Sequence, residues 1–205
     1  RALRDAGAFN GREQPDVRQL LDLVAVATVA DMVPVRDINR TLITAGLKRL
    51  RSNPREGLRA LMQISDIAIS AVTATDLGFR LGPRINARGR LGHAAAAVDL
   101  MLTRDPTQAR ELARVLDAAN RSRRELEKQT VDDAIARVEK SPLLDGAGIV
   151  LFDEAWHPGV LGLVASRLAS RFHRPAIVIG EGGKGSARGV AGLDLHASIA
   201  EVSEH

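Results

Sequence analysis

The feature that most constrains the fold of this chain is a single helix predicted over residues 105–141. Asp105 can cap its start, and Pro106 fits the first helical position, where the missing N–H is not needed. Apolar side chains then recur at spacings of three, four, five and seven, and no glycine or proline follows until Pro142. At ~1.5 Å per residue the helix is on the order of 50 Å long, too long for the core of one small domain. We therefore predict that it is a strut between two bodies.

The composition fits a folded chain and argues against base stacking as a way of binding nucleic acid. Of 205 residues 45% are hydrophobic, so a core can form, and no apolar run reaches the ~18 residues of a membrane span. The lack of cysteine excludes disulfides and favours a reducing cytosol. Four of the 29 basic residues are lysine, which leaves 25 arginines; either phosphate binding or GC-rich coding explains this bias. Aromatic residues are 2%, so a stacking platform for bases is not expected.

The region before the long helix is predicted to be helical. Asp16 can cap a helix over residues 17–30, whose second half is apolar throughout and is therefore expected to be buried on all sides. Two packing helices are predicted over residues 37–50 and 54–64, and a short one around residues 76–81.

Asp31 is the most informative residue of this helical region. It follows the apolar run where the helix ends, which is the unfavourable pole for an anion. A carboxylate is also costly to bury unless it is paired or bound to a metal. Asp31 therefore either caps a turn or pairs with an arginine, or it is a ligand for Mg²⁺ or Mn²⁺ in phosphate chemistry. The further ligands that a metal needs are not found in this sequence.

Residues 82–90, the first arginine stretch, are predicted to be a loop. Glycine and proline at its start and Gly89 near its end indicate tight turns. No acid lies between Asp76 and Asp99, whereas four arginines do, which predicts a local positive field. The stretch is either a phosphate-binding segment or a solvated basic surface.

Residues 182–189, the second arginine stretch, are also predicted to be a loop. Its glycines could form a concave array of backbone N–H groups for an anion around Ser186 and Arg188. A plain hairpin turn is the alternative, and the spacing of a P-loop is absent. We predict that both arginine stretches bind the same nucleic-acid backbone and that the long helix between them fixes their separation.

The region after the long helix is predicted to be α/β. Residues 148–152 and 175–179 are short, β-branched apolar runs, and a helix begins near Pro158 between them. This β-α-β order predicts a parallel strand pair. Asp194 can cap a last helix over residues 195–202.

Five segments resemble, in the same order, the RecJ-type single-strand DNA exonucleases of the DHH phosphoesterase superfamily. Residues 23–34 resemble the fourth phosphoesterase motif, residues 76–90 the GPRxNAxGR segment, and residues 116–125 the connecting helix. Residues 156–160 and 185–188 resemble the DHH-associated C-terminal domain. The resemblance implies a mainly helical end of a DHH domain over residues 1–104, a connecting helix over 105–142, and a partial α/β domain over 143–205.

The resemblance also implies roles for individual residues. Asp31 would be one carboxylate of a two-metal Mn²⁺ or Mg²⁺ site whose activated water attacks the phosphodiester, and Asn86 would orient groups near the metals. The 5′-terminal phosphate and the neighbouring backbone would be held by Arg84, Arg90, Gly185, Ser186 and Arg188. Further contacts to DNA are expected from Arg88, His157 and Lys184.

The activity implied is 5′→3′ hydrolysis of single-stranded DNA in DNA repair and recombination in the cytoplasm. The implied partners are a single-strand binding protein and a helicase, and the resemblance implies no association with a membrane. However, the DxD and DHH motifs that supply most metal ligands are absent, and so is the later GGHxxAAG segment. Arg88 also stands where the family commonly has Ala, and residues 187–189 replace its usual Gly-Arg-Ser. We therefore expect a fragment truncated at both ends that cleaves nothing alone.

Two other readings stay open at this point. A phosphodiesterase for cyclic dinucleotides or very short oligonucleotides would share Asp31 but lack the long connecting helix and the GPRxNAxGR segment at this spacing. A non-catalytic scaffold of a replication complex is the second alternative. Such a scaffold would have no need of a costly acid at position 31.

Overall fold

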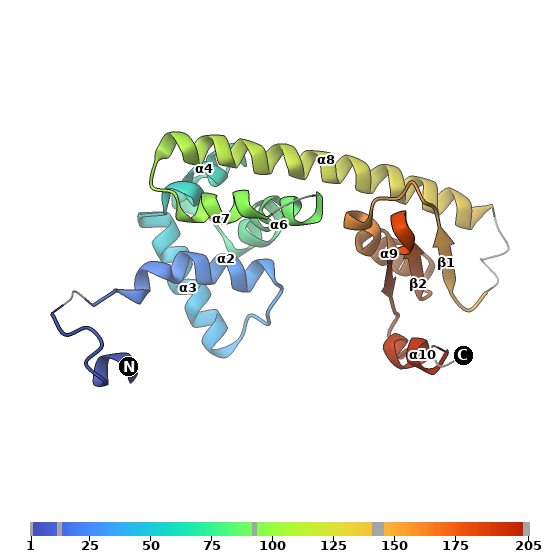
Figure 1. Ribbon diagram of the computed structural model, residues 1–205, viewed down its shortest axis with the longest axis horizontal. Coiled ribbons are helices and arrows are strands. Elements are labelled where there is room, and N and C mark those ends of the chain that lie inside the picture. Colours follow the sequence, from blue (N-terminus) through green and yellow to red (C-terminus); the bar gives the residue numbers. More distant parts are fainter. Residues whose placement is uncertain (1, 12–13, 92–93, 141–145, 203–205) are drawn as a thin grey trace. The chain divides into compact units, whose positions relative to one another are not determined.

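The protein forms two compact units, each of which takes part of one long helix. A computed structural model describes residues 2–11, 14–91, 94–140 and 146–202 (Figure 1). The helical unit comprises residues 1–85 and 97–114, and the sheet unit comprises residues 86–96 and 115–205. Among the described residues, no helix is long and apolar enough to cross a membrane.

Most of the chain is helical, and a small mixed sheet completes it, which confirms the predicted α/β class. The helical unit holds α1 (Ala2–Asp5), η1 (Val17–Leu20), α2 (Leu21–Ala30), α3 (Asp37–Ser52), α4 (Glu56–Ile64), η2 (Ile69–Ala71), α5 (Ala74–Asp76) and the π-helical turn η3 (Leu77–Leu81). Three helices have residues in both units: α6 (Gly82–Leu91), α7 (Ala95–Leu102) and α8 (Pro106–Glu139). The sheet unit holds β1 (Ile149–Phe152), α9 (Pro158–Phe172), β2 (Ala176–Ile179), η5 (Glu181–Gly183), β3 (Gly185–Arg188) and α10 (Leu195–Val202).

The α2 helix packs one face against α3, contacts η3 as well, and leaves part of its surface exposed. A Cβ atom on Gly46 would lie 2.2 Å from the carbonyl oxygen of Leu21, so only glycine permits this close approach. Ala25 and Val26 are buried on this face, whereas Ala27 is exposed. The prediction of burial on all sides is therefore wrong, because an unbroken apolar run does not reveal which face of a surface helix is covered.

The buried acid of α2 is Asp22, which directly precedes the apolar run that begins at Leu23. Its side chain is fully buried, and Arg55 donates to both carboxylate oxygens, from Nε at 2.8 Å and from Nη2 at 2.9 Å. Nη1 of Arg55 donates to the carbonyl oxygen of Met101 at 3.0 Å. This forked, fully bonded pair ties α2 to α4 and to the end of α7.

The first arginine stretch is helical, so the prediction of a loop is wrong. A capping box between Thr73 and Asp76 starts the helix, and the hydroxyl of Thr73 lowers the pKa of Asp76 by hydrogen bonding to its carboxylate. The chain continues without a break through η3 into α6. Pro83 would normally crowd the carbonyl four residues before it. Here the wider π turn precedes it, with the Gly82 N–H bonded to the carbonyl of Leu77.

The sheet unit contains the predicted β-α-β unit and one additional strand. β1 pairs with β2 in parallel, as predicted, and β2 pairs with β3 in an antiparallel register. The added strand β3 lies in the second arginine stretch, which was predicted to be a loop. Ser186 lies opposite Val178 and Arg188 opposite Ala176, so both side chains belong to the sheet face that carries the core.

The α8 helix begins as predicted and joins the core of the sheet unit with its C-terminal half. The N–H of Thr107 donates to the carboxylate of Asp105 at 2.8 Å, which confirms the N-cap. Ala134 and Val138 belong to the same buried cluster as β1, β2 and α9. The predicted stop at Pro142 and the predicted boundary at 142/143 lie outside the described residues.

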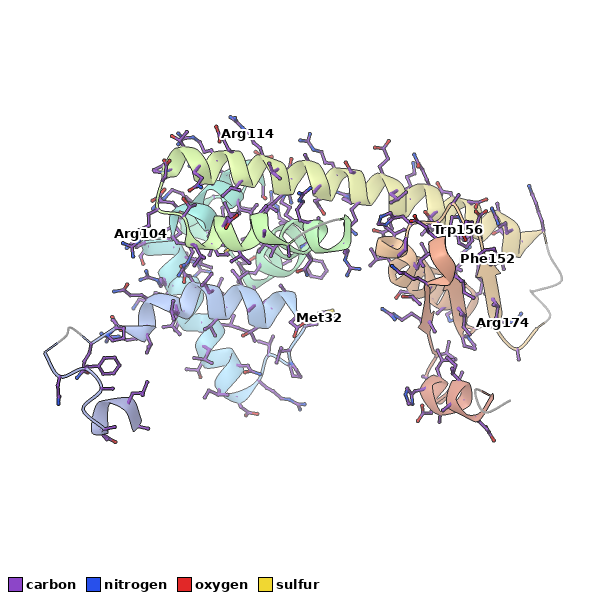
Figure 2. The ribbon with its side chains drawn as sticks, in the orientation of Figure 1. Met32, Arg104, Arg114, Phe152, Trp156 and Arg174 are labelled. Atoms are coloured by element: carbon purple, nitrogen blue, oxygen red, sulfur yellow. The ribbon has the colours of Figure 1, made fainter. Side chains whose placement is uncertain are left out.

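Polar contacts fix α8 to the segment between β1 and α9. The indole N–H of Trp156, which is labelled in Figure 2, donates to Asp133 at 3.0 Å. The guanidinium of Arg137 lies 4.9 Å from the Trp156 ring centroid. Arg137 also forms ion pairs with Asp133 and Asp153. The hydrogen bonds to these two carboxylates raise the pKa of Arg137, and the bond to Asp133 contributes more to this shift. The start of α9 is thereby held in place.

Candidate functional site

Asp31 lies at the C-terminal end of α2 with its side chain exposed, so the expected burial is wrong. The turn that follows is a Schellman motif: the N–H of Met32 donates to the carbonyl of Val29 and that of Val33 to Thr28, both at 3.1 Å. Met32 takes the left-handed conformation, with φ 56°, that this motif usually gives to glycine (Figure 2). The backbone around Asp31 is therefore closely specified although its side chain is open to solvent.

The surroundings of Asp31 suit a cation better than an anion. Among the described residues no hydrogen bond or ion pair reaches its carboxylate, so the alternative of an arginine partner finds no support there. The last carbonyl groups of α2 add partial negative charge at the same point. Within the described ranges no three His, Asp or Glu side chains gather to hold a metal, so Asp31 is not part of a complete metal site there.

The α6 helix divides the predicted residues of the first arginine stretch between two faces. Arg84 and Arg88 are four residues apart and half-buried, whereas Asn86 and Arg90 are four residues apart and exposed. Arg84 donates from Nη1 to the carbonyl of Arg80 at 2.8 Å. Arg84 and Arg90, grouped by the resemblance as phosphate ligands, therefore lie about 120° apart around the helix.

The end of α6 lies against the start of α9 inside the sheet unit. A Cβ atom on Gly159 would lie 2.1 Å from the carbonyl oxygen of Arg90. Pro158 occupies the first position of α9, and Nδ1 of the N-cap His157 accepts a hydrogen bond from the Gly159 N–H at 3.0 Å. The structure thus gives His157 a capping role, and glycine at 159 is required by the backbone that it meets.

The side chains of Ser186 and Arg188 from β3 lie against α9, one turn after Gly159. A Cβ atom on Gly162 would lie 3.3 Å from Nη2 of Arg188 and 3.4 Å from Oγ of Ser186. Nε of Arg188 donates to Oγ of Ser166 at 3.0 Å. The two predicted phosphate ligands of β3 are thus side by side over one glycine.

The second arginine stretch does not form the predicted open array of backbone N–H groups. Gly182 and Gly183 have φ of 65° and 68°, but the N–H of Gly182 donates to the carboxylate of Glu154 at 3.0 Å. The N–H of Gly183 donates to the carbonyl of Gly180. Gly185 pairs with Ile179 in the sheet, and Lys184 is exposed at the turn. Any anion held here would therefore meet side chains.

One face of α9 brings the two arginine stretches together. Gly159, Gly162 and Ser166 follow each other at spacings of three and four, so they share a face. The backbone of Arg90 meets this face at its first residue, and the side chains of β3 meet it at the next two. The prediction that α8 fixes the separation of the two stretches is wrong, because both contact α9 directly. Sequence reasoning missed the face, although its small residues at helical spacing were visible.

Three arginines of the two stretches carry charge that no acid in the described residues compensates. Arg88, Arg90 and Arg188 form no ion pair with a described carboxylate, whereas Arg137 and Arg171 of the same unit do. Nε of Arg88 is buried without a hydrogen-bond partner. Uncompensated guanidinium groups of this kind attract phosphate.

Replacing Gly159 with alanine is expected to destabilise the sheet unit by about 1–3 kcal/mol, because its methyl group would overlap a backbone oxygen that cannot rotate away. Urea unfolding followed by circular dichroism would measure the change. Gly189→Ala is the matched control, since its Cβ atom would meet only ordinary contacts at 3.5 Å. Equal stability of the two variants would show that α6 and α9 do not meet as described.

The comparisons with known proteins point to one family. No family model matches the chain. It is 44% identical over 207 residues to the single-stranded-DNA-specific exonuclease RecJ of Dickeya dadantii and 44% identical over 197 residues to that of Bacillus subtilis. These matches cover 96% and 94% of this chain but 36% and 25% of the relatives, so the chain spans about a third or less of their length.

Solved structures agree with these matches. RecJ from Thermus thermophilus in complex with Mn²⁺ has a TM-score of 0.84 at 32% identity, over 97% of this chain and 29% of that chain. An exonuclease RecJ bound to manganese has a TM-score of 0.80 at 34% identity, over 95% of this chain and 48% of that chain. Because sequence identity and fold agree over almost all of its length, the chain is homologous, over the region that it covers, to the RecJ single-stranded-DNA-specific exonucleases.

Proposed function

We propose that this chain carries the strand-end-binding residues and one metal ligand of a 5′→3′ exonuclease that hydrolyses single-stranded DNA. The observation that carries the proposal is the gathering of Ser186, Arg188 and the end of α6 along one face of α9. The exonuclease name of the relatives favours this reading over a cyclic-dinucleotide phosphodiesterase or a scaffold.

The chemistry of this face suits a terminal phosphate. The guanidinium group of Arg188 can donate to phosphate oxygens in a fork, and the hydroxyl of Ser186 adds a donor beside it. Such contacts carry no sequence information, as befits an enzyme that degrades any strand. Arg90 and Arg88 would extend the positive surface along the neighbouring backbone, with Lys184 and Gly185 at the far end of β3.

Asp31 would serve as one ligand of a Mn²⁺ or Mg²⁺ site. Its carboxylate is exposed at the negative pole of α2 and has no partner among the described residues, which fits a hard cation. Related RecJ structures hold Mg²⁺ and Mn²⁺. Metal ions bound in such a site activate water for attack on phosphorus. Asn86 would orient groups near this centre, and Arg84 would contribute to the phosphate field.

The wider assignment rests on the resemblance to the family. We propose the division into residues 1–104, 105–142 and 143–205, a cytoplasmic role in DNA repair and recombination, and a single-strand binding protein and a helicase as partners. With one metal carboxylate, the chain alone should bind single strands weakly and cleave nothing.

Arg188→Ala and Arg90→Ala should each weaken binding of 5′-phosphorylated single strands by roughly 1.5–3 kcal/mol, the worth of a charge-assisted hydrogen bond. Each should also lower the salt slope by ~0.7. The measurement is a titration with 5′-phosphate and 5′-hydroxyl oligonucleotides at several salt concentrations. Arg171→Ala is the control, since Glu139 already pairs with that arginine at 2.8 Å. Equal losses for both strand ends would restrict these arginines to general backbone contact.

A further inference from the structure

We infer that Ser166 and Gly162 of α9 are positioning residues that hold Arg188 and Ser186 in a geometry ready for phosphate. The inference rests on the proposed function and extends it to two residues that make no contact with DNA themselves. It depends on contacts within α9 and β3 only.

Ser166 fixes the guanidinium group of Arg188 without neutralising it. Its Oγ accepts from Nε of Arg188 at 3.0 Å and donates to the carbonyl of Gly162 at 2.9 Å. Nη1 of Arg188 donates to the carbonyl of Ala187 at 2.8 Å. Both acceptors are neutral oxygens, so the plane of the guanidinium is set while its full charge remains available.

Gly162 keeps the remaining donors together. Nη2 of Arg188 and Oγ of Ser186 both lie over this residue, at 3.3 and 3.4 Å from the position of a missing Cβ. No hydrogen bond within the described residues uses Nη2 of Arg188, so two donors stand side by side over the helix. A methyl group at 162 would push into both, and because both are side-chain ends the fold could yield while their alignment is lost.

The advantage of this arrangement is pre-organisation. An arginine that is already oriented loses less rotamer freedom when phosphate binds, and one immobilised side chain is worth about a 3- to 10-fold change in affinity. The alternative is that the hydroxyl of Ser166 only donates a hydrogen bond to the carbonyl of Gly162, four residues earlier in the same helix. That role would stabilise or bend α9 but would not depend on Arg188.

A double-mutant cycle separates the two roles. We expect Ser166→Ala and Gly162→Ala each to weaken binding of a 5′-phosphorylated single-stranded oligonucleotide by the chain about 3- to 10-fold, and Ser166→Thr, which keeps the hydroxyl, to bind like the wild type. In an Arg188→Ala background, Ser166→Ala should have no further effect. Circular dichroism should show all variants folded, since alanine is a better helix former than serine or glycine.

The possible outcomes separate a failure of the positioning role from a failure of the proposed function. A normal Ser166→Ala variant beside a weakened Arg188→Ala variant overturns the positioning role and leaves the proposed function intact. A Ser166→Ala loss that persists in full without Arg188 also overturns it, because the serine would then act elsewhere. If Arg188→Ala itself binds normally, the proposed function of this face fails, and the inference fails with it.

Discussion

Asp31→Asn in a full-length exonuclease that carries this sequence is expected to reduce kcat by more than ~10-fold, a barrier increase of at least ~1.4 kcal/mol. The substitution keeps the shape of the side chain but removes the charge that a metal ligand needs. Binding of single-stranded DNA should change little, because the residues proposed to bind phosphate lie on α6 and β3. The measurement is Mn²⁺-dependent release of nucleotides from 5′-labelled single strands.

Asp37→Asn is the matched control for this experiment. Asp37 is also exposed, six residues further along the chain at the start of α3, and it has no role in the proposed site. Its activity should stay close to that of the wild type. Asp31→Asn should not lower thermal stability either, since its carboxylate faces the negative pole of α2. An Asp31→Asn enzyme that retains more than a tenth of its activity would end the metal-ligand assignment.

Asp22→Ala should destabilise the helical unit by about 3–5 kcal/mol, because it leaves the guanidinium of Arg55 without its partner beside a buried surface. The carboxylate is fully buried and bonded at both oxygens, so no water can replace it without rearrangement. Urea unfolding of the chain would measure the loss as a lower midpoint.

Two variants sharpen this stability test. Arg18→Ala removes an exposed ion pair with Asp16 but keeps the backbone N–H that Asp16 caps, so it should leave the unfolding midpoint almost unchanged. The double variant Asp22→Leu with Arg55→Met should recover much of the lost stability, because an apolar pair of similar volume can replace a buried ion pair. A loss below about 1 kcal/mol for Asp22→Ala would contradict the buried pair.

The parts of the fold that sequence reasoning predicted are those with local signals. The cap at Asp105 and the uninterrupted apolar recurrence predicted α8, and two β-branched runs around Pro158 predicted the parallel pair. β3 was missed because Gly185 and Ala187 have low strand propensity, and pairing with β2 overrides that preference. Non-local pairing of this kind cannot be read from one segment.

The helical unit shows the same division between local and distant causes. The glycines and proline of α6 suggested a loop, because no signal in the neighbouring sequence indicates the π turn that accommodates Pro83. The choice of the buried acid was also wrong for a distant reason. Asp22 is buried because Arg55, from another helix, reaches it, whereas Asp31 ends its helix in solvent.

The residues proposed to bind phosphate came from a motif, and their role stays a prediction. The structure places Ser186 and Arg188 on one face of β3, which sequence reasoning did not anticipate because it predicted a loop there. Glycine and serine are unremarkable residues in a helix, and the proposed role of Gly162 and Ser166 depends on their contacts with the side chains of β3. A single sequence does not reveal that crossing.

The π turn before Pro83 has a consequence for how this segment can evolve. A π turn amounts to one extra residue inserted in an α-helix, so everything after it is rotated by about 100° relative to a regular helix. Deleting one residue of η3 would restore regular geometry, yet it would turn Asn86 and Arg90 away from their present direction. Insertions and deletions in η3 therefore change the direction in which the side chains of α6 point. We expect the length of η3 to be held fixed wherever the exposed face of α6 is used.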